Sequence, residues 1–213
     1  MTSGRTYRRG MTQRSPSATL SFPASTSPVP RFVRALARRW PALLGLAFAA
    51  FNLVTDDPNS ITAVLLVLVL ATTAYVVIAA LVRPRWSWPV LGVLVVVVVT
   101  ARLLSSGPVV ELAAMTAVAV GAITVGAVRG TFSRPGPWRW QPFAAVGFMA
   151  LGLGALWLSP EGGRVLIAVG LIGHAVWDVA HWRRHAVVSR SLAEWCAALD
   201  LTLGVGVLVL ALA

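Results

Sequence analysis

Residues 61–82 read ITAVLLVLVLATTAYVVIAALV, an unbroken run without one charged side chain. A transmembrane helix needs about 20 mostly apolar residues, because each residue adds about 1.5 Å of rise and the hydrocarbon core is about 30 Å thick. Residues 90–99 (VLGVLVVVVV) begin a second such run shortly afterwards. Two dense apolar runs this close together predict a chain that crosses a membrane repeatedly.

The composition of the whole chain agrees with this prediction. Of its 213 residues, 57% are hydrophobic and only 12% are charged, whereas soluble domains carry about 25% charged residues. We therefore place the chain in the membrane class. The single cysteine, Cys196, excludes an intramolecular disulfide. The sequence shows no nucleotide-binding glycine loop, cysteine-rich zinc knuckle or nucleophile elbow.

We predict an all-α transmembrane bundle of about seven helices within residues 38–213. The expected spans are 38–55, 61–82, 88–104, 109–128, 142–158, 164–183 and 193–212. The first span also resembles a signal peptide with a cleavage site near Ala47-Phe48-Ala49, and cleavage there would leave six spans. We favour an uncleaved helix because the apolar run continues to Val54. Small residues at four-residue spacing, Ala113, Ala117 and Gly121 and also Ala122 and Gly126, predict close helix contact in the fourth span.

Residues 1–37 are rich in Ser, Thr, Pro and Arg, and we predict a disordered, basic cytoplasmic tail. At its end, Phe32 and Leu36 fall on one face of a possible helix among four arginines. This segment is expected either to lie on an anionic lipid surface or to remain a solvated tail.

The arginines indicate the orientation. The net charge is +11, and every basic residue is an arginine. Sixteen of the eighteen fall in the tail or in alternate loops, and the other two are Arg102 and Arg164. Cytoplasmic loops are enriched in basic residues, so the N-terminus and the basic loops are predicted to be cytoplasmic, in a bacterial plasma membrane. We expect the bilayer and its anionic head groups as partners, not nucleic acid, and an oligomer is possible.

Arg102 and Glu111 flank the third loop and are expected to pair or to lie among head groups.

The candidate catalytic or metal-ligating residues are concentrated in the sixth span. His174, Asp178, His181 and His185 all fall within about 60° of arc when each helical residue turns about 100°. A carboxylate at the centre of a spanning helix costs roughly 2.5–3.5 kcal/mol. This polar stripe should therefore face protein rather than lipid.

The seventh span supplies candidate partners, because Glu194, Cys196 and Asp200 lie near its cytoplasmic end. Cys196 and Asp200 share a helical face, and Asp200 is expected at the depth of Asp178. Tyr75 and Thr72 of the second span lie at a comparable depth. Adjacent antiparallel helices would surround one polar site in the cytoplasmic half of the membrane.

Four interpretations of this site remain open. His174, Asp178, His181 and Asp200 have the chemistry of ligands for Zn, Fe or Mn, with Asp178 and Asp200 as candidate catalytic carboxylates of an intramembrane enzyme. The same groups in a water-lined cavity would suit a proton-coupled carrier of small solutes. His174 or His181 is also a candidate haem ligand. Finally, His–Asp hydrogen bonds can simply join helices.

The segments His174–Arg183 (HAVWDVAHWR) and Ala193–Asp200 (AEWCAALD) resemble a pattern of uncharacterised bacterial multi-pass membrane proteins, which implies no activity. The spacings of His174 to Asp178 and of His181 to His185 are similar to those of seven-helix intramembrane metal hydrolases of the alkaline ceramidase and adiponectin-receptor type. Those enzymes place another histidine on an early helix, and this chain has none there. The resemblance implies a metal-binding bundle but does not carry the activity over.

Overall fold

The computed structural model describes residues 31–55, 61–104 and 108–212, which form helices without any strand. Six helical segments in this part are long and apolar enough to cross a membrane. Their helices are α3 (Thr62–Leu81), α4 (Ser87–Leu104), α5 (Pro108–Val128), α6 (Gln141–Gly154), α7 (Pro160–Arg184) and α8 (Arg190–Leu212). Short 3-10 helices adjoin them: η1 (Pro84–Trp86), η2 (Thr131–Ser133), η3 (Gly136–Trp140) and η4 (Ala155–Trp157). The chain is thus an all-helical protein of the multi-pass membrane type.

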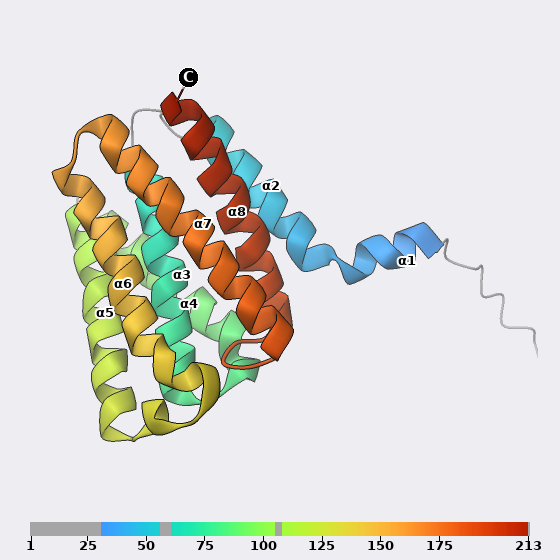
Figure 1. The fold of residues 1–213 in the computed structure, drawn as a ribbon, viewed down its shortest axis with the longest axis vertical. Helices are drawn as coiled ribbons and strands as arrows, with labels where there is room; N and C mark the ends of the chain where they lie inside the picture. The colour runs from blue at the N-terminus through green and yellow to red at the C-terminus, as the bar shows by residue number, and fades with distance from the viewer. Residues whose placement is uncertain (1–30, 56–60, 105–107, 213) are drawn as a thin grey trace, which may run out of the picture.

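The six predicted spans from 61 to 212 match these segments closely, but the first span does not. In its place are α1 (Arg31–Arg38) and α2 (Trp40–Thr55), which meet at a turn at Arg39. With 16 residues, α2 is shorter than the roughly 20 that a perpendicular span requires. Figure 1 shows α1 extending away from the bundle. A seventh crossing therefore stays a prediction, and residues 1–30 of the predicted tail lie outside the described residues.

Although short, α2 packs closely along α8 (Figure 1). A Cβ atom added at Gly45 would lie 2.5 Å from the backbone oxygen of Trp195, so only glycine fits at this crossing. Ala49, one turn later on the same face, is completely buried. Cleavage near residue 49 would remove most of this contact, and the uncleaved first helix stays a prediction.

We expect Gly45→Ala to weaken the bundle. Overpacking costs about 1–3 kcal/mol, and the better helix propensity of alanine returns about 1 kcal/mol, so a net loss of about 1 kcal/mol is expected. Gly92→Ala is the matched control, because no described atom would lie within 4 Å of its new Cβ. Apparent thermal unfolding midpoints in detergent should fall for Gly45→Ala and hold or rise for Gly92→Ala. Equal midpoints would contradict the tight α2–α8 crossing.

The central helix of the bundle is α3, which contacts α4, α5, α6, α7 and α8. In its apolar window 72% of the residues are buried, against 28–44% in the other five spanning segments. The dense Leu/Val run of residues 61–82 therefore forms the core of the protein instead of facing lipid. Its position matters for the site, because α3 carries Thr72 and Tyr75 into the middle of the bundle.

The starts of α2, α4 and α8 meet at one end of the bundle, which we call the arginine-rich end. Arg39 forms an ion pair with Glu194 at 3.1 Å. The backbone N–H of Ser189 donates to Ser87 Oγ at 2.8 Å. Trp40 and Trp88 pack with ring centroids 5.5 Å apart, as expected of an aromatic belt at a membrane interface. The shared end confirms the predicted grouping of these segments, while its cytoplasmic location stays a prediction.

The opposite end contains the predicted Arg102–Glu111 pair. Arg102 Nε donates to Glu111 Oε1 at 2.7 Å, which confirms the pairing. The predicted contact face of α5 holds only at its end: Ala113, Ala117 and Gly121 are exposed, whereas Gly126 is buried against Thr131 and Phe132 of η2. The close approaches between helices fall on glycines of α2, α6, α7 and α8.

Candidate functional site

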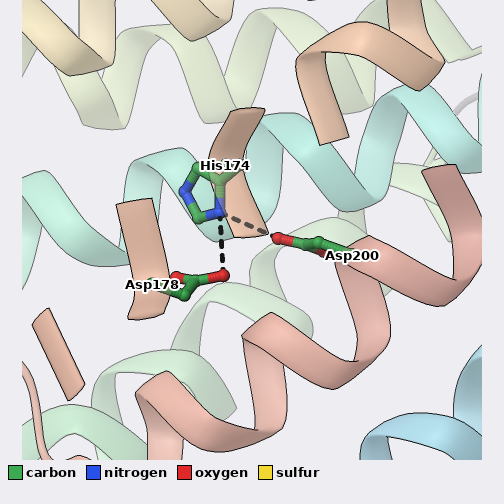
Figure 2. A group of neighbouring side chains, drawn as sticks. All are labelled: His174, Asp178 and Asp200. Carbon is green, nitrogen blue, oxygen red and sulfur yellow. Dashed lines mark hydrogen bonds and ion pairs between the residues drawn. The ribbon is translucent and has the colours of Figure 1, made fainter. Parts of the chain in front are cut away.

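The site lies between α7 and α8, which pack against each other more extensively than any other pair of described helices. His174 and Asp178 are one turn apart on α7, and Asp200 faces them from α8 (Figure 2). Gly204, one turn after Asp200, permits this approach, because a Cβ there would lie 3.1 Å from the backbone oxygen of Ala168. The predicted antiparallel pairing of the last two helices therefore brings these three side chains together.

The three side chains form one compact group. His174 Nδ1 lies 2.8 Å from Asp200 Oδ2 and 3.4 Å from Asp178 Oδ2 (Figure 2). One ligand atom from each residue lies within 4.8 Å of the other two. The side chains are only 1%, 0% and 0% exposed. A single imidazole nitrogen thus faces two carboxylates inside an apolar bundle.

The carboxylate oxygens at this site are poorly supplied with donors. Within the described part of the chain, Asp178 Oδ1 and Asp200 Oδ1 have no hydrogen-bond partner, and Asp178 Oδ2 has only the 3.4 Å ion pair with His174. The hydroxyl groups of Thr72 and Tyr75 on α3 are likewise buried without one. A buried carboxylate without partners is unfavourable by several kcal/mol or more unless a cation or proton neutralises it. The group is therefore chemically incomplete as a purely structural hydrogen-bond network.

Aromatic rings from α3 and α6 fix the imidazole. Tyr75 packs edge-on against His174 and against His181, with ring centroids 5.3 Å apart in both pairs. Phe148 covers His174 at 4.9 Å. Tyr75 therefore reaches the same polar centre that α7 and α8 provide.

His181, a predicted metal ligand, lies outside this group because both of its ring nitrogens are engaged. Nδ1 lies 2.8 Å from the Trp177 backbone oxygen, which can only accept, so Nδ1 carries the proton. Nε2 then accepts from Gln141 Nε2 at 2.8 Å, and that amide also donates to the Pro137 oxygen. His181 is thus held as a neutral, satisfied imidazole. As it stands, it offers no free nitrogen to a metal or a haem.

Gln141 contacts a residue of the predicted site but was not itself predicted as a site residue. It lies at the boundary of the predicted fifth span, where polar residues usually face head groups, yet it is 1% exposed. The only feature of the sequence that could have indicated its role is an isolated amide side chain directly beside an apolar run. Because the partner, His181, is 40 residues away, the pair is visible only once α6 and α7 are placed side by side.

The remaining predicted residues lie around the site without completing it. His185 is exposed and ends α7 in the left-handed conformation, with φ of 50°, so it leaves the predicted stripe. Glu194 pairs with Arg39 at the arginine-rich end. Cys196 is buried and interacts electrostatically with Asp178 and Asp200, but it lies outside the compact group.

The spacing of the three ligand atoms suits a small cation. Bonds of about 2.0–2.2 Å to zinc place two ligand atoms of a tetrahedral site roughly 3.4 Å apart. The separation of His174 Nδ1 from Asp178 Oδ2 is 3.4 Å, and that from Asp200 Oδ2 is 2.8 Å. The first separation matches this value, the second would have to lengthen by about 0.6 Å, and each ligand atom lies within 4.8 Å of the other two. One imidazole and two carboxylates are also the ligand types that Zn, Fe and Mn accept.

Comparison with known proteins yields no match to a protein family, to a curated protein or to a solved structure. The geometry of the His174–Asp178–Asp200 group is therefore the basis for its function.

Proposed function

We propose that this protein binds one divalent transition metal at His174, Asp178 and Asp200, and that it acts as a metal-dependent enzyme within a bacterial plasma membrane. Zinc, iron and manganese are the candidate ions. The observation that carries the proposal is the set of three buried carboxylate oxygens without hydrogen-bond partners around one imidazole. A divalent ion would neutralise the two carboxylates and satisfy these oxygens together.

The ligand set is compatible with catalysis. A metal held by His174, Asp178 and Asp200 would supply Lewis-acid chemistry and would activate water near neutral pH. The unpartnered hydroxyl groups of Tyr75 and Thr72 lie on the neighbouring helix, where they could hold a polar group of a substrate. Because the group is enclosed by apolar helices, the substrate class that fits best is a lipid or a small hydrophobic molecule that arrives through the bilayer.

Metal content is the first test. The protein, purified in detergent without chelators and loaded with Zn²⁺, Fe²⁺ or Mn²⁺, should retain about one ion per chain after desalting, as a closed three-ligand site would. Asp178→Asn and His174→Ala should retain almost none. His185→Ala removes an exposed imidazole from the same helix and should retain the ion. Elemental analysis that finds no ion in the wild type, or equal content in Asp178→Asn, would refute the metal site.

A second function has one specific observation in its favour. His174 Nδ1 already lies within hydrogen-bond distance of Asp200, so a proton can occupy the place of the cation and pass between the carboxylates. A carrier that couples solute movement to this proton would bind no metal. It would show solute flux driven by a pH gradient in proteoliposomes, and Asp178→Asn would abolish that flux. If neither metal nor flux is found, the group most simply joins α3, α7 and α8.

A further inference from the structure

A second candidate site lies at the arginine-rich end, far along α3 from the His174 group. A cavity of about 580 Å³ opens where the segment after α3 meets the α5–α6 connection. Its lining residues are Leu81, Val82, Arg83, Pro84, Arg85 and Arg134. Three of the six are arginines and none is acidic. The cavity is open to its surroundings rather than enclosed.

The backbone presents these arginines from restricted positions. Val82 ends α3 in the left-handed conformation, with φ of 54°, and turns the chain towards Arg83. Arg83 and Arg134 each precede a proline, which disfavours the helical conformation at both residues; both are non-helical, and Arg134 is extended. Binding would therefore order the side chains but not the backbone, which lowers its entropic cost.

No acidic group of the described residues neutralises the cavity. The acidic residues in this part of the chain are Glu111, Glu161, Asp178, Glu194 and Asp200. The three glutamates pair with arginines outside the cavity, and the two aspartates are buried beside His174. The three cavity arginines therefore produce a positive potential that favours an anion.

The surroundings indicate which anion. Leu81 and Trp86 flank the arginines and are 39% and 48% exposed, at the point where the apolar α3 ends. Tryptophan at such a position is typical of the head-group level of a bilayer. A ligand here would meet arginines on one side and the apolar helix on the other. A phospholipid combines both features, whereas a free phosphate ion uses only the first.

We propose that Arg83, Arg85 and Arg134 bind the phosphate group of an anionic membrane lipid in this cavity. Guanidinium groups donate paired hydrogen bonds to phosphate oxygens, and three of them around one cavity distinguish a bound lipid from general attraction to a charged surface. The proposal is independent of the metal site, because none of its residues contacts His174, Asp178 or Asp200 in the interactions described above.

Native mass spectrometry of the full chain in detergent tests the proposal. The added probes are phosphatidylglycerol, phosphatidylcholine and inorganic phosphate. The triple variant Arg83→Gln/Arg85→Gln/Arg134→Gln removes the site. Arg129→Gln/Arg183→Gln/Arg184→Gln removes the same charge from exposed positions outside the cavity and is the matched control. Size-exclusion chromatography and the thermal unfolding midpoint show whether each variant remains folded.

We expect phosphatidylglycerol to bind the wild type and the control triple variant more tightly than phosphatidylcholine. Its affinity for the cavity triple variant should fall on the order of 100-fold, since each arginine near a lipid phosphate contributes roughly fivefold. Equal losses in both triple variants would overturn the proposal, because they would indicate charge alone. Displacement of phosphatidylglycerol by inorganic phosphate at matched concentrations would overturn the lipid as the ligand. An unfolded cavity variant is replaced by the single Arg134→Gln, which should still lose severalfold in affinity.

Discussion

Asp178→Asn is expected to destabilise the metal-loaded protein and to stabilise the metal-free protein. With metal at about 1,000 times its dissociation constant, binding stabilises the wild type by about 4 kcal/mol, and the variant should lose most of this. Without metal, the same substitution removes a negative charge that is compensated in the described structure only by the 3.4 Å ion pair with His174, whose imidazole keeps its closer partner Asp200. Replacement of a poorly compensated buried charge by a neutral group of the same shape should then gain about 1 kcal/mol.

The measurement is the apparent thermal unfolding midpoint in detergent, with Zn²⁺ or Mn²⁺ in excess and again with a strong chelator. The order of wild type and Asp178→Asn should reverse between the two conditions. His185→Ala should follow the wild type in both, since His185 is exposed and lies outside the group. A purely structural role predicts the same order with and without metal, and that result would contradict the metal site.

Gln141→Leu is expected to reduce the free energy of unfolding by about 2 kcal/mol, because it leaves the buried Nε2 of His181 without a donor. His181→Phe should also destabilise, since it leaves one Gln141 N–H unsatisfied. The double variant replaces both partners by apolar groups, so its loss should be smaller than the sum of the single losses by about 1–2 kcal/mol.

The quantity to measure is this coupling energy, from thermal unfolding of the wild type, both single variants and the double variant. Asn52→Leu is the matched control, because Asn52 also donates an amide hydrogen to the backbone oxygen four residues earlier, but at an exposed position. Its effect should stay within about 0.5 kcal/mol. Strictly additive losses for Gln141 and His181 would show that the 2.8 Å contact does not couple them.

The sequence by itself determined the helical class and six spanning segments, because a chain this apolar can satisfy its backbone groups within a membrane only by forming helices or closed barrels. It also determined the part of the site that lies on a single helix. The spacing of His174 and Asp178 places both on one face of α7, whatever the partner. The Arg102–Glu111 pair followed similarly, because a short loop keeps opposite charges close.

Tertiary structure alone decided the rest. The choice of Asp200 over Cys196 as the partner of His174 depends on the register of α8 against α7, which is set by the close fit at Gly204. Gln141 forms a hydrogen bond with His181 only because α6 lies beside α7. His185 leaves the stripe because the chain turns there, and α2 is short because the helix breaks at Arg39. The physical reason is common to all: periodicity fixes directions within one helix, whereas packing fixes the distances between helices.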